Sequence, residues 1–279
     1  MNKRLVSADR PETEDKVQYH IHLKPGDVSR YVLLPGDPDR VSKITKDWDR
    51  VEEMAKHREY LTQTGFYKGV RVSVCSTGIG SSAAAIAVEE LANIGADTFI
   101  RVGSTGSIQK ECKCGDLIIS TGAVRLEGTS KEYVRAEYPA VASYDVVAAL
   151  IEAVESLGYQ YHVGITASTD SFFCGQARPG FRGYKQSWME NLIPDLRAAK
   201  VYNFEMEAAA ILTLSGLFGL RAGAVCTVFA NRVTDEFKVV GEEEAGKTAT
   251  EAVRILHEWD EAREKKGKKH WFPTLVFRS

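Results

Sequence analysis

The sequence predicts an α/β fold: a single-domain, three-layer α/β/α arrangement with a central mixed β-sheet covered by helices on both faces. Short apolar runs rich in Val, Ile and Leu alternate along the chain with longer stretches of helical periodicity. Glycines and prolines follow several of these apolar runs, as they do at the ends of strands. The chain has 279 residues, 44% of them hydrophobic, which is enough for one large core.

The first strand is predicted at residues 31–34, because the turn Pro-Gly-Asp-Pro ends the apolar run Tyr-Val-Leu-Leu. A helix is expected from Asp39 onward. Residues 59–76 are typical of a hairpin, since valines alternate with polar residues toward the end of this region. A glycine turn then opens an alanine-rich helix over residues 83–93, which Gly95 ends.

A short strand is predicted at residues 98–102, ending in the loop Gly-Ser-Thr-Gly, and another at 117–121. An amphipathic helix covers residues 143–157 and stops at a glycine. A strand at 161–167 leads into a polar, glycine-containing loop from 169 to about 185.

A strand at residues 222–230 and a long final helix complete the chain. We expect one domain over residues 1–279, in which residues 1–18 and 265–279 are terminal extensions. The basic and aromatic C-terminal extension is interpreted as a helix end followed by a segment packed on the body or on a neighbour.

The composition argues against several classes of protein. A formal net charge of −2 provides no basic field for nucleic acid. No run approaches the roughly 18 apolar residues of a membrane span, and the polar N-terminus is unlike a signal peptide. Five scattered cysteines, with only Cys112 and Cys114 close together, indicate reduced thiols in a cytoplasmic protein without a metal site.

Several strand ends carry features that bind anions. Gly36 allows a backbone N–H to approach a ligand, and Arg40 follows about one helical turn later. Residues 103–105 offer donors beside Arg101, and Arg58 follows His57 in a predicted strand region. Three arginines with glycine and hydroxyl groups, at the strand ends of an open α/β sheet, favour a phosphate-type ligand.

The stretch Gly-Ile-Gly-Ser-Ser-Ala at residues 78–83 matches the dinucleotide-binding pattern. The next strand, however, carries Arg101 and ends in Gly-Ser-Thr-Gly, without the acidic residue that would bind an adenosine ribose. We therefore interpret the glycines as a tight turn between strand and helix, and predict no NAD.

Two glutamates, Glu205 and Glu207, lie in the apolar stretch 201–211, although a buried carboxylate is costly unless it is paired. Taken alone, the stretch is typical of a helix start, with Asn203 as the N-cap and both acids in the first turn. A glycosidase pair is disfavoured. On a helix the two residues lie about 200° apart; on a strand they lie about 6–7 Å apart, with no sign of separate acid and base roles.

Together these motifs resemble the nucleoside phosphorylases of the purine and uridine class, from about His20 to about His257. The matching segments, in order, are V-L-L-P-G-D-P-D-R, H-R-E, V-C-S-T-G-I-G, A-V-E-E-L, F-I-R-V-G-S-T-G-S-I-Q, T-A-S-T-D-S-F-F-C-G-Q-A-R, N-F-E-M-E and A-N-R. The resemblance, nearest to the uridine branch, implies a nucleoside phosphorylase-like fold. It also implies reversible phosphorolysis of uridine to uracil and ribose 1-phosphate, with inorganic phosphate as co-substrate and no cofactor.

The resemblance also implies a role for particular residues. Those expected to bind phosphate are Gly36, Arg40, Arg58, Arg101 and Ser104, with Arg58 reaching in from a neighbouring subunit. Those expected to bind ribose are His20, again from a neighbour, Glu205, Met206 and Glu207. Those expected to bind the base are Phe172, Gln176, Arg178 and Arg232. Arg101, Arg178 and Glu207 are expected to take part in catalysis.

The segment G-Q-A-R favours a pyrimidine, because a glutamine amide complements the imide edge of uracil. Similar purine enzymes carry a serine-aspartate pair where this chain has Asn231 and Arg232. Relatives often carry an aliphatic pair where this chain has Phe229 and Ala230. The shape of the pocket around C5 of the base is therefore left open, and with it the preference among uridine, deoxyuridine and thymidine. A base-releasing hydrolase, which would lack the phosphate arginines, and a non-catalytic nucleoside-binding protein are the alternatives.

The same resemblance implies a homo-oligomer, a hexamer built from dimers that share active sites. Some relatives bind potassium between subunits; Glu59 and Ile79 match that set, but Ala83 replaces its serine, so no metal is predicted. The expected partners are a nucleoside and phosphate, with no nucleic acid and no membrane.

Overall fold

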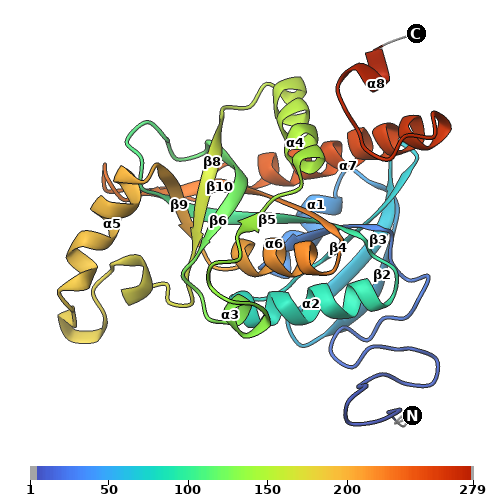
Figure 1. The fold of residues 1–279 in the computed structure, drawn as a ribbon, viewed down its shortest axis with the longest axis horizontal. Coiled ribbons are helices and arrows are strands. Elements are labelled where there is room, and N and C mark those ends of the chain that lie inside the picture. Colours follow the sequence, from blue (N-terminus) through green and yellow to red (C-terminus); the bar gives the residue numbers. More distant parts are fainter. Residues whose placement is uncertain (1–4, 278–279) are drawn as a thin grey trace.

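The computed structural model describes residues 5–277 and has the three layers that the sequence predicts (Figure 1). Its strands are β1 Tyr31–Pro35, β2 Asp49–His57, β3 Tyr60–Tyr67, β4 Val70–Cys75, β5 Thr98–Ser107, β6 Leu117–Arg125, β7 Ala140–Val141, β8 Tyr161–Ser168, β9 Val201–Glu205, β10 Arg221–Asn231 and β11 Glu236–Phe237. Its α-helices are α1 Asp39–Thr45, α2 Ser81–Asn93, α3 Thr129–Tyr133, α4 Tyr144–Leu157, α5 Trp188–Ala198, α6 Ala208–Leu217, α7 Glu242–Lys265 and α8 Thr274–Phe277. Short 3₁₀ turns occupy Cys174–Gln176 and Phe181–Gly183.

The sheet is mixed, in the order β11-β10-β6-β8-β9-β5-β1-β4-β3-β2, with β7 beside β6. Strands β1, β4, β5 and β10 run parallel, so their carboxyl ends meet at one edge. β5 also pairs with both β9 and β10, which closes β5, β9, β8, β6 and β10 into a ring. The expectation of an open sheet is therefore wrong for this part, and the closure gathers several strand ends around one space.

Helices cover both faces of the sheet (Figure 1). One buried cluster joins α1, α4 and α7 to the sheet, with Leu150 and Leu256 packed among residues such as Ile100. A second cluster joins α2 and α6 to the opposite face through residues such as Val88 and Ile211. Because each helix buries one apolar side, or in α6 nearly all of its surface, the sheet between them is held rigidly.

Two local predictions are wrong. Residues 103–106 continue β5 and pair with β10 instead of forming a loop, so side chains rather than loop N–H groups are presented there. Asn203 is not an N-cap, because it lies in β9, where its amide donates to Thr105 Oγ1 at 2.7 Å and accepts from Thr166 Oγ1 at 2.9 Å. Pairing with β8 and β5 outweighs the local preference for a helix start.

The segment after α7 packs against that helix. After α7, Trp271 stacks on Trp259 with ring centroids 3.9 Å apart, and Leu275 is buried. Among the described residues, no helix combines the length and the apolar character needed to cross a bilayer.

Candidate active site

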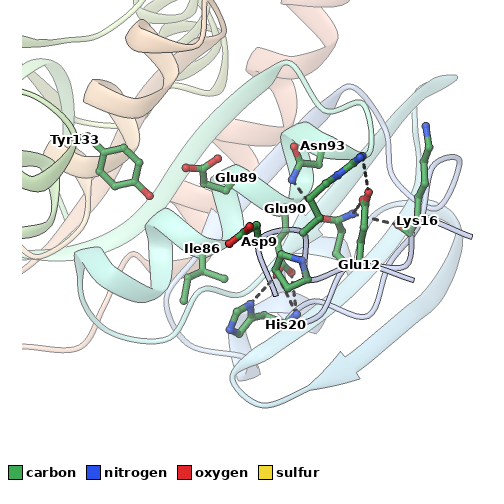
Figure 2. Close-up of a pocket in the computed structure, with 12 residues that line it drawn as sticks. Asp9, Glu12, Lys16, His20, Ile86, Glu89, Glu90, Asn93 and Tyr133 are labelled. Carbon is green, nitrogen blue, oxygen red and sulfur yellow. Dashed lines mark hydrogen bonds and ion pairs between the residues drawn. The ribbon is translucent and has the colours of Figure 1, made fainter. Parts of the chain in front are cut away.

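Two cavities differ sharply in chemistry. The larger, of about 510 Å³, lies between the N-terminal segment and α2 and is lined mainly by acidic and other polar side chains, among them Glu89 and Glu90 (Figure 2). The smaller, of about 440 Å³, lies where β1, β4, β5, β9 and β10 end. Its lining consists of Gly36, Asp37, Pro38, Arg40, Gly78, Ile79, Arg101, Ser104, Thr105, Gly106, Phe172, Gln176, Arg178, Phe204, Glu205, Met206, Glu207, Phe229, Ala230 and Phe237. Because it combines buried arginines, glutamates and aromatic rings from separate segments, the smaller cavity is the candidate active site.

Arg101 is the central cation of this cavity. It comes from β5, is 4% exposed, and its Nη2 donates to the Glu207 carboxylate, while Nε lies 3.5 Å from Glu205 Oε2. The side chain folds back over Gly103, where a Cβ atom would lie only 2.9 Å from Nη2. Burial would lower the pKa of Arg101, but Glu207 and Glu205 raise it above its ordinary value. Arg101 is thus a permanently charged group in a fixed position.

One nitrogen of Arg101 is left without a partner. Its Nη1 is buried and makes no hydrogen bond within the described part of the chain. It lies toward Gly36, since a Cβ atom built on Gly36 would be 3.5 Å away. An unsatisfied buried donor on a cation costs free energy, so this position is suited to an anion that enters the cavity.

Arg40 and Ser104 complete this basic end. Arg40 projects from α1, and its Nη2 donates to Ser104 Oγ at 3.2 Å. Its Nε donates to Glu242 Oε1 at 2.6 Å. The structure therefore brings together Gly36, Arg40, Arg101 and Ser104, four of the five predicted phosphate residues.

The two glutamates have different surroundings. Glu205 Oε2 accepts the N–H groups of Glu207 and Ala208, both at 2.8 Å, and its Oε1 accepts from the Ser168 hydroxyl. Its carboxylate is therefore engaged in holding the start of α6. Glu207 lines the same cavity from the N-cap position of that helix, and accepts from Gly80 N at 2.5 Å and from Arg101. Burial raises the pKa of Glu207, and Arg101 opposes that rise.

The turn at residues 78–80 belongs to the site, which the sequence interpretation missed. We explained its glycines by a tight turn, whereas Gly78 and Ile79 line the cavity and the N–H of Gly80 holds Glu207. Gly80 has a φ of +101°, a conformation that favours glycine and aims this N–H at the carboxylate. The G-x-G pattern was a usable signal, because such turns present backbone donors.

The opposite end of the cavity is built by the loop after β8. Gln176 is buried, and its Oε1 accepts from Arg178 Nη1 at 2.6 Å. The guanidinium carbon of Arg178 lies 4.0 Å from the centroid of the Phe172 ring. Burial, together with the nearby Arg232, lowers the pKa of Arg178 to about 10. Positive charge is disfavoured there, so an anionic group would be stabilised.

Three predicted site residues do not line the cavity of their own chain. Arg232 supports the loop, with Nη1 donating to the carbonyl of Gln176 at 2.9 Å. His20 points to Glu90, with Nδ1 and Oε1 2.7 Å apart, at the other cavity (Figure 2). Arg58 lies in the turn between β2 and β3, beside His57, whose Nδ1 is 2.7 Å from the carbonyl of His20. His20 and Arg58 thus lie near one another.

One further lining residue gave no clear signal in the sequence. Phe237 comes from the short strand β11 and is 67% exposed. It lines the cavity only because distant segments meet here. Within residues 5–277, no three His, Cys, Asp or Glu side chains form a group able to hold a metal ion.

Comparison with known proteins connects this geometry to a family. The model of the phosphorylase superfamily matches residues 30–258. A uridine phosphorylase from Thermococcus kodakarensis is 65% identical over 275 residues, covering 99% of both chains. A uridine phosphorylase from Klebsiella aerogenes is 42% identical over 74% of this chain and 81% of its own. A guanosine phosphorylase from Halorubrum lacusprofundi is 39% identical over 79% of this chain and 86% of its own.

Proposed function

The chain belongs to the phosphorylase superfamily, and from its similarity to uridine phosphorylases and the lining of its cavity we propose that it is an enzyme that cleaves uridine reversibly with phosphate, forming uracil and ribose 1-phosphate. One observation carries the proposal: a single cavity has a basic end around Arg101, a carboxylate at Glu207 and an amide-guanidinium end at Gln176 and Arg178. These three regions suit the three parts of the reaction, which are phosphate, ribose and base.

Phosphate would occupy the basic end. Nη1 of Arg101, which has no partner among residues 5–277, and the terminal nitrogens of Arg40 can donate to its oxygens, and Ser104 adds a hydroxyl. Held there, a phosphate oxygen can attack C1′ of the ribose. The negative charge of phosphate also stabilises the positive charge that develops on the sugar.

Ribose would lie against Met206 with its 2′- and 3′-hydroxyls directed to Glu207. Since Gly80 and Arg101 hold the Glu207 carboxylate in place, it is ordered before the sugar arrives. Glu205 supports this arrangement through the start of α6 rather than through the substrate.

Uracil would stack on Phe172 and meet Gln176 and Arg178. As the bond between C1′ and N1 breaks, its electron pair moves onto the base, which becomes negatively charged. Arg178, whose positive charge is disfavoured by burial and by the nearby Arg232, gains most from that new charge. Arg232 acts by holding the carbonyl of Gln176.

The test is release of free base from uridine, deoxyuridine, thymidine, inosine, guanosine and adenosine, each measured with and without inorganic phosphate. We expect phosphate-dependent release of uracil, with purine nucleosides much slower. Release without phosphate would indicate a hydrolase, no release would indicate a binding protein, and faster release from guanosine would move the assignment to the purine branch.

The proposal includes a hexamer of dimers in which His20 and Arg58 complete the site of a neighbour. Its support is that both residues lie near one another yet outside the cavity of their own chain. Mixing and reassembling the inactive variants Arg58→Ala and Arg101→Ala should restore about a quarter of wild-type activity, because some sites then combine intact halves. A mixture that stays inactive, or a monomeric mass in solution, would contradict shared sites.

We also infer that the reaction uses no cofactor or metal, with phosphate as the second substrate, and that it takes place in the cytoplasm. All five cysteines are unpaired, which suits a reducing compartment. Full activity after dialysis against a chelator and localisation by cell fractionation would test these two statements.

A further inference from the structure

Glu242 is a charged residue that contacts the basic end of the cavity without lining the cavity itself. It is the first residue of α7, and its Oε1 accepts from Arg40 Nε at 2.6 Å. Its Oε2 accepts from Lys43 Nζ, also at 2.6 Å. Arg40 lies 202 positions away in the sequence. The remaining nitrogens of Arg40 are left for Ser104 and for the cavity.

The place of Glu242 is set by the strand next to Ser104. Thr227 on β10 pairs in register with Ser104 on β5, and its hydroxyl donates to the carbonyl of Gly241 at 2.6 Å. Gly241 has a φ of +77°, and a Cβ atom there would lie 2.8 Å from the Thr227 methyl group. Only glycine therefore allows this close contact, which places the following residue, Glu242, beside Arg40.

We propose that Glu242 is a positioning residue for phosphate: it orients Arg40 so that the two terminal guanidinium nitrogens face the incoming anion. This inference rests on the proposed function. A free arginine loses considerable rotamer entropy when it binds, and an arginine already held by Nε loses less. Orientation of Arg40 before binding therefore strengthens the binding of phosphate.

A carboxylate near phosphate also repels it, and the arrangement limits this effect. Two cations, Arg40 and Lys43, share the single carboxylate of Glu242, so the group as a whole stays positive. Burial would raise the pKa of Glu242, but the hydrogen bonds from Lys43 and Arg40 outweigh it and keep the pKa below its ordinary value. Glu242 thus remains ionised and paired at neutral pH.

The test compares Glu242→Gln with the matched control Glu243→Gln. Glu243 is the next residue, and its carboxylate pairs only loosely with Lys46 at 3.8 Å and Lys247 at 3.6 Å. For Glu242→Gln we expect KM for phosphate to rise about tenfold, as for loss of one hydrogen bond to a charged group, with KM for uridine and kcat nearly unchanged. The control should match the wild type in all three constants.

Two further measurements keep the inference refutable. Glu242→Asp, which keeps the charge but draws it back from Arg40, should give an intermediate KM for phosphate and serves if Glu242→Gln does not fold. Calorimetric titration with inorganic phosphate should show the same weakening without any turnover. An unchanged or lowered KM for phosphate in Glu242→Gln would overturn the positioning role. If the wild type binds phosphate but releases no uracil, the proposed function fails, and the titration still decides the role of Glu242.

Discussion

Replacing Glu207 by Gln separates the contact with ribose from the other roles of this carboxylate. Glu207 is 3% exposed, and its two oxygens accept from Gly80 and Arg101. Glutamine has nearly the same shape but has one N–H₂ group in place of an oxygen. The substitution therefore removes the charge that strengthens bonds to the sugar hydroxyls, while the volume of the site is kept.

The size of the effect follows from the number of hydroxyls. A hydrogen bond to a charged group contributes about 1.5–3 kcal/mol, and each 1.4 kcal/mol is a tenfold change. Uridine offers both the 2′- and the 3′-hydroxyl to Glu207, whereas deoxyuridine offers only the 3′-hydroxyl. The loss on uridine should therefore exceed the loss on deoxyuridine by about one such bond, roughly 10- to 100-fold in kcat/KM.

The assay measures kcat/KM for both nucleosides, at saturating phosphate, with the wild type and with Glu207→Gln. Loss of the ion pair with Arg101 affects both substrates in the same enzyme, so it cancels in the ratio. Equal losses on uridine and deoxyuridine would refute the contact with the vicinal hydroxyls. The carboxylate would then act only through Arg101.

Three further predictions concern the two ends of the cavity and the core. Arg101→Ala should lower kcat/KM by more than about 100-fold, because it removes the central cation; unchanged activity would reject the phosphate site. Arg178→Ala should lower kcat about 100-fold with little change in KM for phosphate, which initial rates at varied phosphate would check. Asp260→Ala should lower the free energy of unfolding by about 3–5 kcal/mol, because Arg221 Nη2, which donates to Asp260 Oδ2 at 2.7 Å, would lose its partner. Urea titrations measure this change, with Glu261→Gln at an exposed position as the control. Burial would raise the pKa of Asp260, but Arg221 lowers it overall, so this stabilisation is present at neutral pH and is lost as the pH falls below about 4.

The sequence predicted much of the fold because its signals are local. The helix over residues 144–157 was expected within one residue of its observed start, since apolar spacing and a terminal glycine mark it. The strand over 98–107 was predicted too short, because its glycines look like a loop and only pairing with β10 extends them. The order of the strands, and the ring that β5 closes with β9 and β10, had no local signal.

The candidate site likewise contains residues that local motifs indicate and residues whose role depends on contacts far along the chain. Arg40, Arg101 and the segment containing Gln176 and Arg178 stand in short motifs that could be recognised, and the structure gathers them into one cavity. The turn at 78–80 was misjudged, because its function depends on Glu207, which lies 127 positions away.

By itself, the sequence determined the three layers, the strand ends that carry glycine and arginine, and the residue types suited to phosphate and pyrimidine. Apolar period and turn chemistry act over a few residues, so they can be read along the chain. Only the tertiary structure decided that Glu205 accepts the N–H groups at the start of α6, that Nη1 of Arg101 is left without a partner within residues 5–277, and that Glu242 binds Arg40. These contacts join residues far apart in sequence, and they form only when the packed sheet and helices bring those residues together.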